Sequence, residues 1–201
     1  MTRPPVAGPA TWGARVISSA RRRFGPPWSL RHRRPGPRQV PKEPLTIQIA
    51  AATGSGATGV AAFDAALCEL GVGEANLIRL SSVIPPQARV ESTGRINTPI
   101  NWGDRLYCVY ATGHANTPGA RAAAGIGWTT RDDGAGLFVE HEAGTADEVE
   151  HLVRASLADM TRYRSGRFGP VRVRTTETRC DDRPVCAVVL AAFGASGWDR
   201  L

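Results

Sequence analysis

Two consecutive prolines, Pro85 and Pro86, restrict the fold in the most distinctive stretch of the chain, residues 73–86. Proline cannot donate a hydrogen bond to a central strand ladder, so an extended segment must end here. The residues at 76–80, Asn-Leu-Ile-Arg-Leu, favour a short strand just before this point. The pair Ser81-Ser82 falls between that strand and the prolines. The pattern therefore predicts two hydroxyl groups in a tightly constrained turn.

A serine in a strained turn can react with its own backbone. Its hydroxyl can attack the carbonyl of the preceding residue, here Ser81, and convert the peptide into an ester by an N→O acyl shift. β-Elimination then breaks the chain and leaves a dehydroalanine, which hydrolyses to a pyruvoyl group at the new amino end. Such a keto group is an electron sink for amines. The open alternative is an ordinary serine pair at a strand end.

Several motifs surround the serine pair in a definite order. They are Gly54-Ser55-Gly56, Ala-Ala-Phe-Asp-Ala-Ala-Leu at 61–67, Gly71-Val72-Gly73, Asn-Leu-Ile-Arg at 76–79, Ser-Ser-Val-Ile-Pro-Pro at 81–86 and Gly-Leu-Phe-Val-Glu-His-Glu at 136–142. In this order they resemble the pyruvoyl-dependent arginine decarboxylase family. The resemblance is strongest over residues 45–91, extends less closely over 120–165 and leaves out the first forty residues.

This resemblance implies an enzyme that cleaves itself between Ser81 and Ser82 and carries a pyruvoyl cofactor made from Ser82. The family's reaction converts arginine to agmatine and CO₂, its fold is an αββα sandwich, and its active site lies between the subunits of a trimer. Another basic amino acid remains open as the substrate. The alternative function is a non-cleaving, inactive relative that acts as a binding or scaffold protein.

The resemblance also assigns catalytic roles. Ser82 is the nucleophile, and the amide of Asn76 would stabilise the oxyanion of the cleavage reaction. Glu140 is the proton donor to the substrate carbanion. Because Glu140 follows an apolar run, desolvation is expected to raise its pKa and favour the protonated form. Strand alternation leaves open a solvent-facing Glu140, and Glu142 is the alternative acid.

Substrate binding is assigned to a second set of residues. Asp64 stands alone among apolar residues in the segment 61–67, and a carboxylate can bind a guanidinium through two parallel hydrogen bonds. The family's binding aspartate matches this position. Gly73, Ala75 and Ser81 match its other substrate contacts. The alternatives are a solvated charge at Asp64 and turn residues at Gly73 and Asn76.

The positive charge of the chain is confined to its beginning. Residues 1–40 contain nine arginines and no acidic residue, whereas the remainder has 16 basic and 18 acidic residues. We expect residues 1–42 to be a disordered Arg- and Pro-rich extension and residues 43–201 to form one decarboxylase-like domain. The extension is open to three interpretations: a segment without function, a binder of an anionic partner, or a targeting segment. We expect no nucleic-acid partner except through this extension.

Hydrophobic periodicity predicts an α+β fold, with helices packed on sheet faces. Helices are expected at 58–70, capped by Thr58 and Gly71, and from Thr145 to about Arg164. Strands are expected at 45–50, 76–80, 105–111, 122–130, 137–141, 170–176 and 184–193, and a glycine-rich loop at 53–59.

Composition argues against other classes of protein. The four cysteines show no C-x-x-C spacing, so we expect no metal site. Gly54, Gly56 and Gly59 have the spacing of a dinucleotide-binding motif, but no ribose-binding acid follows at the right distance. No apolar stretch is long enough to span a membrane. The cytoplasm is the expected location.

Overall fold

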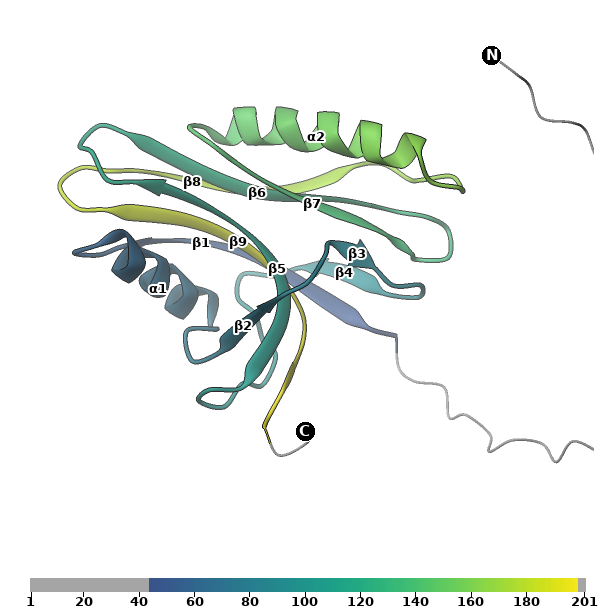
Figure 1. The fold of residues 1–201 in the computed structure, drawn as a ribbon, viewed down its shortest axis with the longest axis horizontal. Coiled ribbons are helices and arrows are strands. Elements are labelled where there is room, and N and C mark those ends of the chain that lie inside the picture. Colours follow the sequence, from purple (N-terminus) through teal and green to yellow (C-terminus); the bar gives the residue numbers. More distant parts are fainter. Residues whose placement is uncertain (1–43, 199–201) are drawn as a thin grey trace, which may run out of the picture. The chain divides into compact units, whose positions relative to one another are not determined.

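The computed structural model describes residues 44–198, so the predicted extension 1–42 lies outside the described residues. Two helices and nine strands follow one another in this part of the chain (Figure 1): β1 (Thr46–Ser55), α1 (Gly59–Leu70), β2 (Asn76–Arg79), β3 (Val83–Ile84), β4 (Arg89–Ser92), β5 (Arg105–Ala115), β6 (Arg121–Thr130), β7 (Gly136–Ala143), α2 (Ala146–Arg162), β8 (Arg172–Arg179) and β9 (Val185–Ser196).

The strands form two sheets. The first has the order β2-β5-β9-β1-β4 and is mixed, because β2 is parallel to β5 and β4 is parallel to β1. The second has the order β3-β7-β6-β8 and is antiparallel throughout. β9 is buried over its first eight residues, as expected for a central strand.

The layers run α1, first sheet, second sheet, α2 (Figure 1). One buried cluster joins α1 to the first sheet through residues such as Ala62, Ala66 and Leu190, and another joins α2 to the second sheet through Val149, Val153 and Leu157. A third cluster fills the space between the sheets. The predicted α+β sandwich with helices on its outer faces is confirmed.

Both helix starts were predicted correctly. The Thr58 side chain accepts a hydrogen bond from the Ala61 amide at 3.2 Å, and Gly71 ends α1 with φ of 83°. At α2, Thr145 and Glu148 form a reciprocal capping box.

The expected glycine-rich loop at 53–59 is shorter in the structure and spans only residues 56–58, because β1 continues to Ser55 and α1 begins at Gly59. A Cβ atom on Gly54 would lie 2.3 Å from the Ala62 carbonyl oxygen, and one on Gly56 would lie 2.6 Å from the Ala62 amide nitrogen. The glycines therefore allow the backbone of α1 to approach β1, which explains their spacing without a nucleotide. Within residues 44–198, no helix is long and apolar enough to cross a membrane.

Candidate active site

The serine pair lies where the chain crosses from one sheet to the other. β2 pairs with β5 in the first sheet, and the Leu80 amide extends this pairing by donating to the Cys108 carbonyl at 2.9 Å. β3, which begins at Val83, then pairs with β7 in the second sheet. Ser81 is exposed and Ser82 is half-buried at this crossing.

The backbone of Ser82 is strained. Its φ is +46°, and only one other non-glycine residue in the described part of the chain, Gln87, has a positive φ. A left-handed conformation costs an L-residue about 1–2 kcal/mol. The Phe138 amide donates to the Ser82 carbonyl at 2.8 Å, so pairing with β7 fixes the strained residue. Such strain requires support from the surrounding structure and is typical of functional sites.

Glu140 lies directly beside the Ser82 hydroxyl. The Ser82 Oγ is 2.7 Å from Oε1 and 2.9 Å from Oε2 of Glu140, so the hydroxyl donates to the carboxylate. Glu140 is two residues beyond Phe138 on β7, and therefore shares with it the face toward the first sheet. The carboxylate is half-buried, in contrast to the solvent-facing alternative.

The opposite face of β7 carries His141, whose Nε2 is 2.8 Å from the Ser156 hydroxyl on α2. Glu142 returns to the inner face, but it is exposed. Glu140 and Glu142 thus face the same way, and Glu140 is the one in contact with Ser82.

A cavity of about 310 Å³ opens beside Glu140. It is lined by Arg79, Tyr110, Ala111, Thr112, Glu140, His141 and Glu142. The Arg79 guanidinium lies 4.9 Å from the centre of the Tyr110 ring and donates to the Tyr110 carbonyl at 3.2 Å. The site therefore combines carboxylates, a cation and an aromatic face, which suits a substrate that carries both charges.

Two buried thiols lie close to this cavity. Burial raises the pKa of Cys108 to about 12, against the opposing effect of the Arg79 charge. Burial and the nearby Glu142 carboxylate raise the pKa of Cys186 to about 11. Both thiols are therefore protonated at neutral pH and are poor nucleophiles.

A second cavity, of about 450 Å³, shares Tyr110 and Thr112 with the first. Its other lining residues are Thr58, Gly59, Val60, Phe63 and His114. The apolar side chain of Val60 is 80% exposed here. This cavity extends the concave surface from Glu140 to the start of α1.

Asp64 lies on α1 next to Phe63, is exposed, and makes no hydrogen bond or ion pair with the described residues. It does not line the Glu140 cavity. Gly73 and Ala75 lie in the turn between α1 and β2. A Cβ on Gly73 would be 2.5 Å from the Cys68 Sγ, so packing beneath α1 also requires glycine there. Ala75 packs against the α1 cluster.

Asn76 begins β2, and its side chain points away from Ser82. Its amide donates to the Gly103 carbonyl at 2.7 Å, and its backbone amide donates to the Asp104 carbonyl, also at 2.7 Å. At about 3.3 Å per residue, Asn76 is about 13 Å from Leu80, at the far end of the extended segment. Within one chain, Asn76 therefore makes no contact with the Ser82 hydroxyl.

The structure thus separates the predicted residues into two groups. Ser81, Ser82 and Glu140 lie together. The other group consists of Asp64 on α1, Gly73 and Ala75 in the turn after it, and Asn76 at the beginning of β2. Sequence reasoning assigned no role to Arg79, Tyr110 or Thr112. Arg79 lies within the motif Asn-Leu-Ile-Arg at 76–79. The strand pattern did not show that Arg79 faces Tyr110 and Thr112 on neighbouring β5.

A strained serine, hydrogen-bonded to a half-buried carboxylate where the chain crosses between two sheets, is the centre of the candidate active site of this α+β sandwich protein. Comparison with known proteins identifies the family. The family model of pyruvoyl-dependent arginine decarboxylase (PvlArgDC) matches residues 46–197. The chain belongs to the pyruvoyl-dependent arginine decarboxylase family.

The chain aligns with several members of the family over most of their length. The pyruvoyl-dependent arginine decarboxylase of Thermococcus kodakarensis is 37% identical over 154 residues, which cover 75% of this chain and 95% of the relative. The protein of that name from Pyrococcus abyssi is 35% identical over 153 residues, covering 74% and 92%. The one from Halobacterium salinarum is 37% identical over 152 residues, covering 75% and 94%.

Proposed function

We infer that this protein is a pyruvoyl-dependent decarboxylase that converts arginine to agmatine and CO₂. The observation that supports this most directly is the hydrogen bond from the Ser82 hydroxyl to Glu140 at a left-handed backbone position, within a chain of this family. Nothing favours the inactive alternative, because both the serine and the carboxylate are present and in contact.

Maturation begins with Ser82. The Glu140 carboxylate accepts a hydrogen bond from the hydroxyl and orients Oγ. Oγ adds to the Ser81 carbonyl carbon, the Ser81–Ser82 peptide bond breaks, and the hydroxyl proton passes to the Ser82 nitrogen. Loss of the Ser82 Cα proton and cleavage of its Cβ–Oγ bond then release residues 1–81 with a carboxylate end. Hydrolysis of the remaining dehydroalanine then releases its nitrogen as ammonia and leaves the pyruvoyl group.

The residues present fit a pyruvoyl group at position 82. The Phe138 amide holds the carbonyl of residue 82, which cleavage leaves in place, and Glu140, which contacts Ser82, lines the cavity. The group supplies an electron sink for the bond to the substrate carboxyl. Glu140 remains beside the reacting carbon and delivers the proton that replaces CO₂.

The substrate guanidinium binds to Asp64 of a neighbouring subunit. Within one chain Asp64 is exposed, has no ionic partner among the described residues and lies apart from Glu140. A closed ring of copies, a trimer as the family resemblance implies, brings α1 and the beginning of β2 of one copy to Glu140 of the next. Gly73 and Ala75 then line the substrate pocket, and Asn76 donates to the oxyanion across the interface.

One set of measurements on the purified protein tests this function. Intact mass should show two chains, residues 1–81 and 82–201, and the larger should react with hydrazine at its keto end. The protein should release CO₂ from carboxyl-labelled arginine without added pyridoxal phosphate. Ornithine, lysine, histidine and aspartate serve as comparison substrates. A single unbroken chain in a correctly assembled sample would contradict the proposal.

A further inference from the structure

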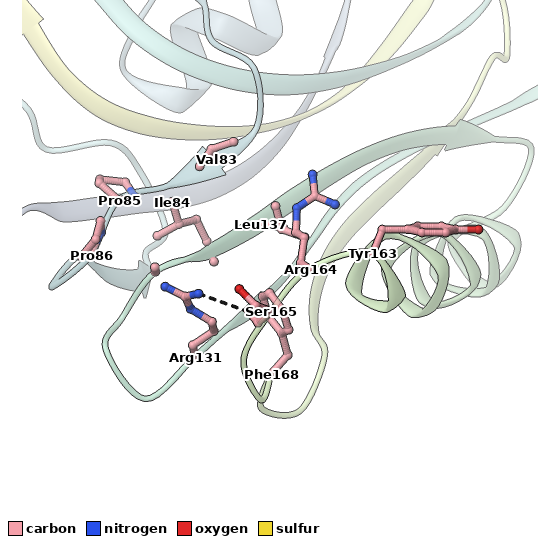
Figure 2. Close-up of a pocket in the computed structure, with 12 residues that line it drawn as sticks. Val83, Ile84, Pro85, Pro86, Arg131, Leu137, Tyr163, Arg164, Ser165 and Phe168 are labelled. Carbon is pink, nitrogen blue, oxygen red and sulfur yellow. Dashed lines mark hydrogen bonds between the residues drawn. The ribbon is translucent and has the colours of Figure 1, made fainter.

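A further cavity lies apart from the one beside Glu140. This outer cavity has a volume of about 540 Å³, within the range of about 300–1,000 Å³ typical of small-molecule sites. Figure 2 shows it between the prolines that follow β3, the beginning of β7 and the segment after α2. Its lining residues are Val83, Ile84, Pro85, Pro86, Arg131, Ala135, Gly136, Leu137, Tyr163, Arg164, Ser165 and Phe168.

This cavity lies away from the candidate active site. It shares no lining residue with the cavity that contains Glu140. Leu137 packs with α2 on the outer face of the second sheet, whereas Phe138 and Glu140 face inward. The proposed reaction at Ser82 and Glu140 therefore does not use the outer cavity.

The walls combine apolar surface with positive charge. Val83 is 58% exposed, and the prolines, Leu137 and Phe168 add further apolar surface. Two arginines line the cavity, and no lining residue is acidic.

The charge of one arginine is already compensated. Arg131 donates to both carboxylate oxygens of Asp133, at 3.2 and 2.7 Å, and to the Ser165 carbonyl at 3.2 Å (Figure 2 shows the last of these). This pairing lowers the pKa of Asp133 below its usual value. Arg131 therefore acts mainly as a tether for the segment after α2.

Arg164 keeps its charge available. Its Nη1 donates to the Met160 carbonyl at 2.7 Å, and it forms no ion pair within residues 44–198. Arg164 and Leu137 both line the cavity, and both are labelled in Figure 2. A guanidinium at the edge of an apolar cavity can bind a carboxylate through two parallel hydrogen bonds.

We propose that this outer cavity binds a small organic carboxylate with an apolar, ring-sized body. The carboxylate pairs with Arg164, and the body packs against Val83, Pro86 and Leu137. This binding does not rest on the proposed function, because none of these residues takes part in cleavage or decarboxylation.

The bound molecule also holds β3 against β7. β3 is only two residues long, and its pairing consists of Val83 with Leu137 and Ile84 with Gly136, extended by the hydrogen bond from the Phe138 amide to the Ser82 carbonyl. A ligand in contact with both Val83 and Leu137 opposes separation of the two strands. It thereby stabilises the position of residue 82 over Glu140.

Calorimetric titration with naphthaleneacetate, naphthaleneacetamide and naphthylmethylamine tests the binding. These probes share one body and carry a negative charge, no charge and a positive charge. The purified protein should bind the acid about tenfold more tightly than the amide, as expected for one charge-assisted hydrogen bond, and the amine most weakly. Arg164→Met should remove the preference for the acid while the amide affinity stays the same.

Arg167→Met is the matched control. Arg167 is exposed in the same segment and does not line the cavity, so this variant loses the same charge but should keep the preference. Equal affinity for acid and amide, or an unchanged preference in Arg164→Met, would overturn the proposal. The uncleaved Ser82→Ala chain should bind the acid like the unaltered protein, so a failure of the self-cleavage mechanism is separable from a failure of this site.

NMR locates the ligand and tests its effect on β3. The methyl signals of Val83, Ile84 and Leu137 should shift on addition of naphthaleneacetate; shifts confined to other methyl groups would reject the site. Hydrogen exchange of the Phe138 amide should slow by about 100-fold at a ligand concentration of 100 times Kd, because exchange requires β3 to detach. An unchanged exchange rate at saturation would reject the stabilisation of β3.

Discussion

At the scale of single residues, backbone strain and hydrogen bonding at Ser82 both favour the proposed attack of its hydroxyl on the Ser81 carbonyl. The left-handed backbone raises the energy of the intact peptide by about 1–2 kcal/mol, and the bond to Glu140 orients the hydroxyl. The proposed cleavage would relieve the strain because residue 82 would no longer have a residue before it. Ser81 would contribute only its carbonyl to this reaction, and its own hydroxyl is exposed.

The two serines are therefore expected to differ sharply on substitution. Ser82→Ala should abolish both chain cleavage and CO₂ release, because the nucleophile is lost. Ser81→Ala, the matched control, should still cleave, because its backbone carbonyl remains. Denaturing mass spectrometry distinguishes one chain from two. Cleavage in the Ser82→Ala variant, or loss of cleavage in the Ser81→Ala variant alone, would contradict the assignment of Ser82 as the nucleophile.

Glu140→Gln should separate maturation from turnover. The glutamine oxygen can still accept the Ser82 hydroxyl bond, so we expect the chain to cleave. The amide cannot deliver the proton to the substrate carbon, and CO₂ release should fall by about 10²–10⁴-fold. Glu142→Gln is the control, since Glu142 is exposed and makes no contact with Ser82. The opposite ranking of the two variants would make Glu142 the acid.

At the scale of elements, close approach of α1 to β1 depends on glycines. Gly54→Ala would place a Cβ 2.3 Å from the Ala62 carbonyl oxygen and 2.4 Å from the Ala66 amide nitrogen. Since both are backbone atoms, α1 must move, and we expect the free energy of unfolding to fall by about 1–3 kcal/mol or more. Urea denaturation measures this loss. Gly94→Ala is the control, because no atom lies within 4 Å of its Cβ position, and a comparable loss there would contradict the packing argument.

The elements differ in how well sequence patterns predict them. α1 and α2 were predicted because caps such as Thr58 and Thr145 mark their beginnings. β3 was not predicted, because a strand of two residues is too short to show alternation. β4 was not predicted either. The extension of β1 to Ser55 was mistaken for a loop because glycine indicates a turn unless a helix packs on it.

The candidate site was only partly predictable for a related reason. The motif order identified Ser82 and Glu140, and the structure places them in contact although 58 residues separate them. Arg79 and Tyr110 were missed, because their contact depends on the parallel pairing of β2 with β5, which no local pattern encodes. The roles of Asn76 and Asp64 stay predictions.

At the scale of the whole molecule, the proposed site would combine residues from two copies of the chain. Within one copy, Asp64 does not line the cavity that contains Glu140 and makes no hydrogen bond or ion pair with the described residues. In a closed cyclic assembly, each interface would join the Ser82–Glu140 group of one subunit to the group around Asp64 of the next. Loss of either group should then inactivate a site without altering the other half of the same subunit.

Subunit mixing tests this arrangement. Asp64→Ala and Glu140→Gln assemblies should each be nearly inactive. When the two chains are produced together, an interface that takes Glu140 from the Asp64→Ala chain and Asp64 from the Glu140→Gln chain is intact. Random mixing in equal amounts makes this about one interface in four, so CO₂ release should return to about a quarter of the unaltered rate. Mixing separately purified assemblies without exchange of subunits is the control and should restore nothing. If co-produced chains stay as inactive as either parent although mass spectrometry shows mixed assemblies, the site is complete within one chain, and Asp64 does not act across the interface.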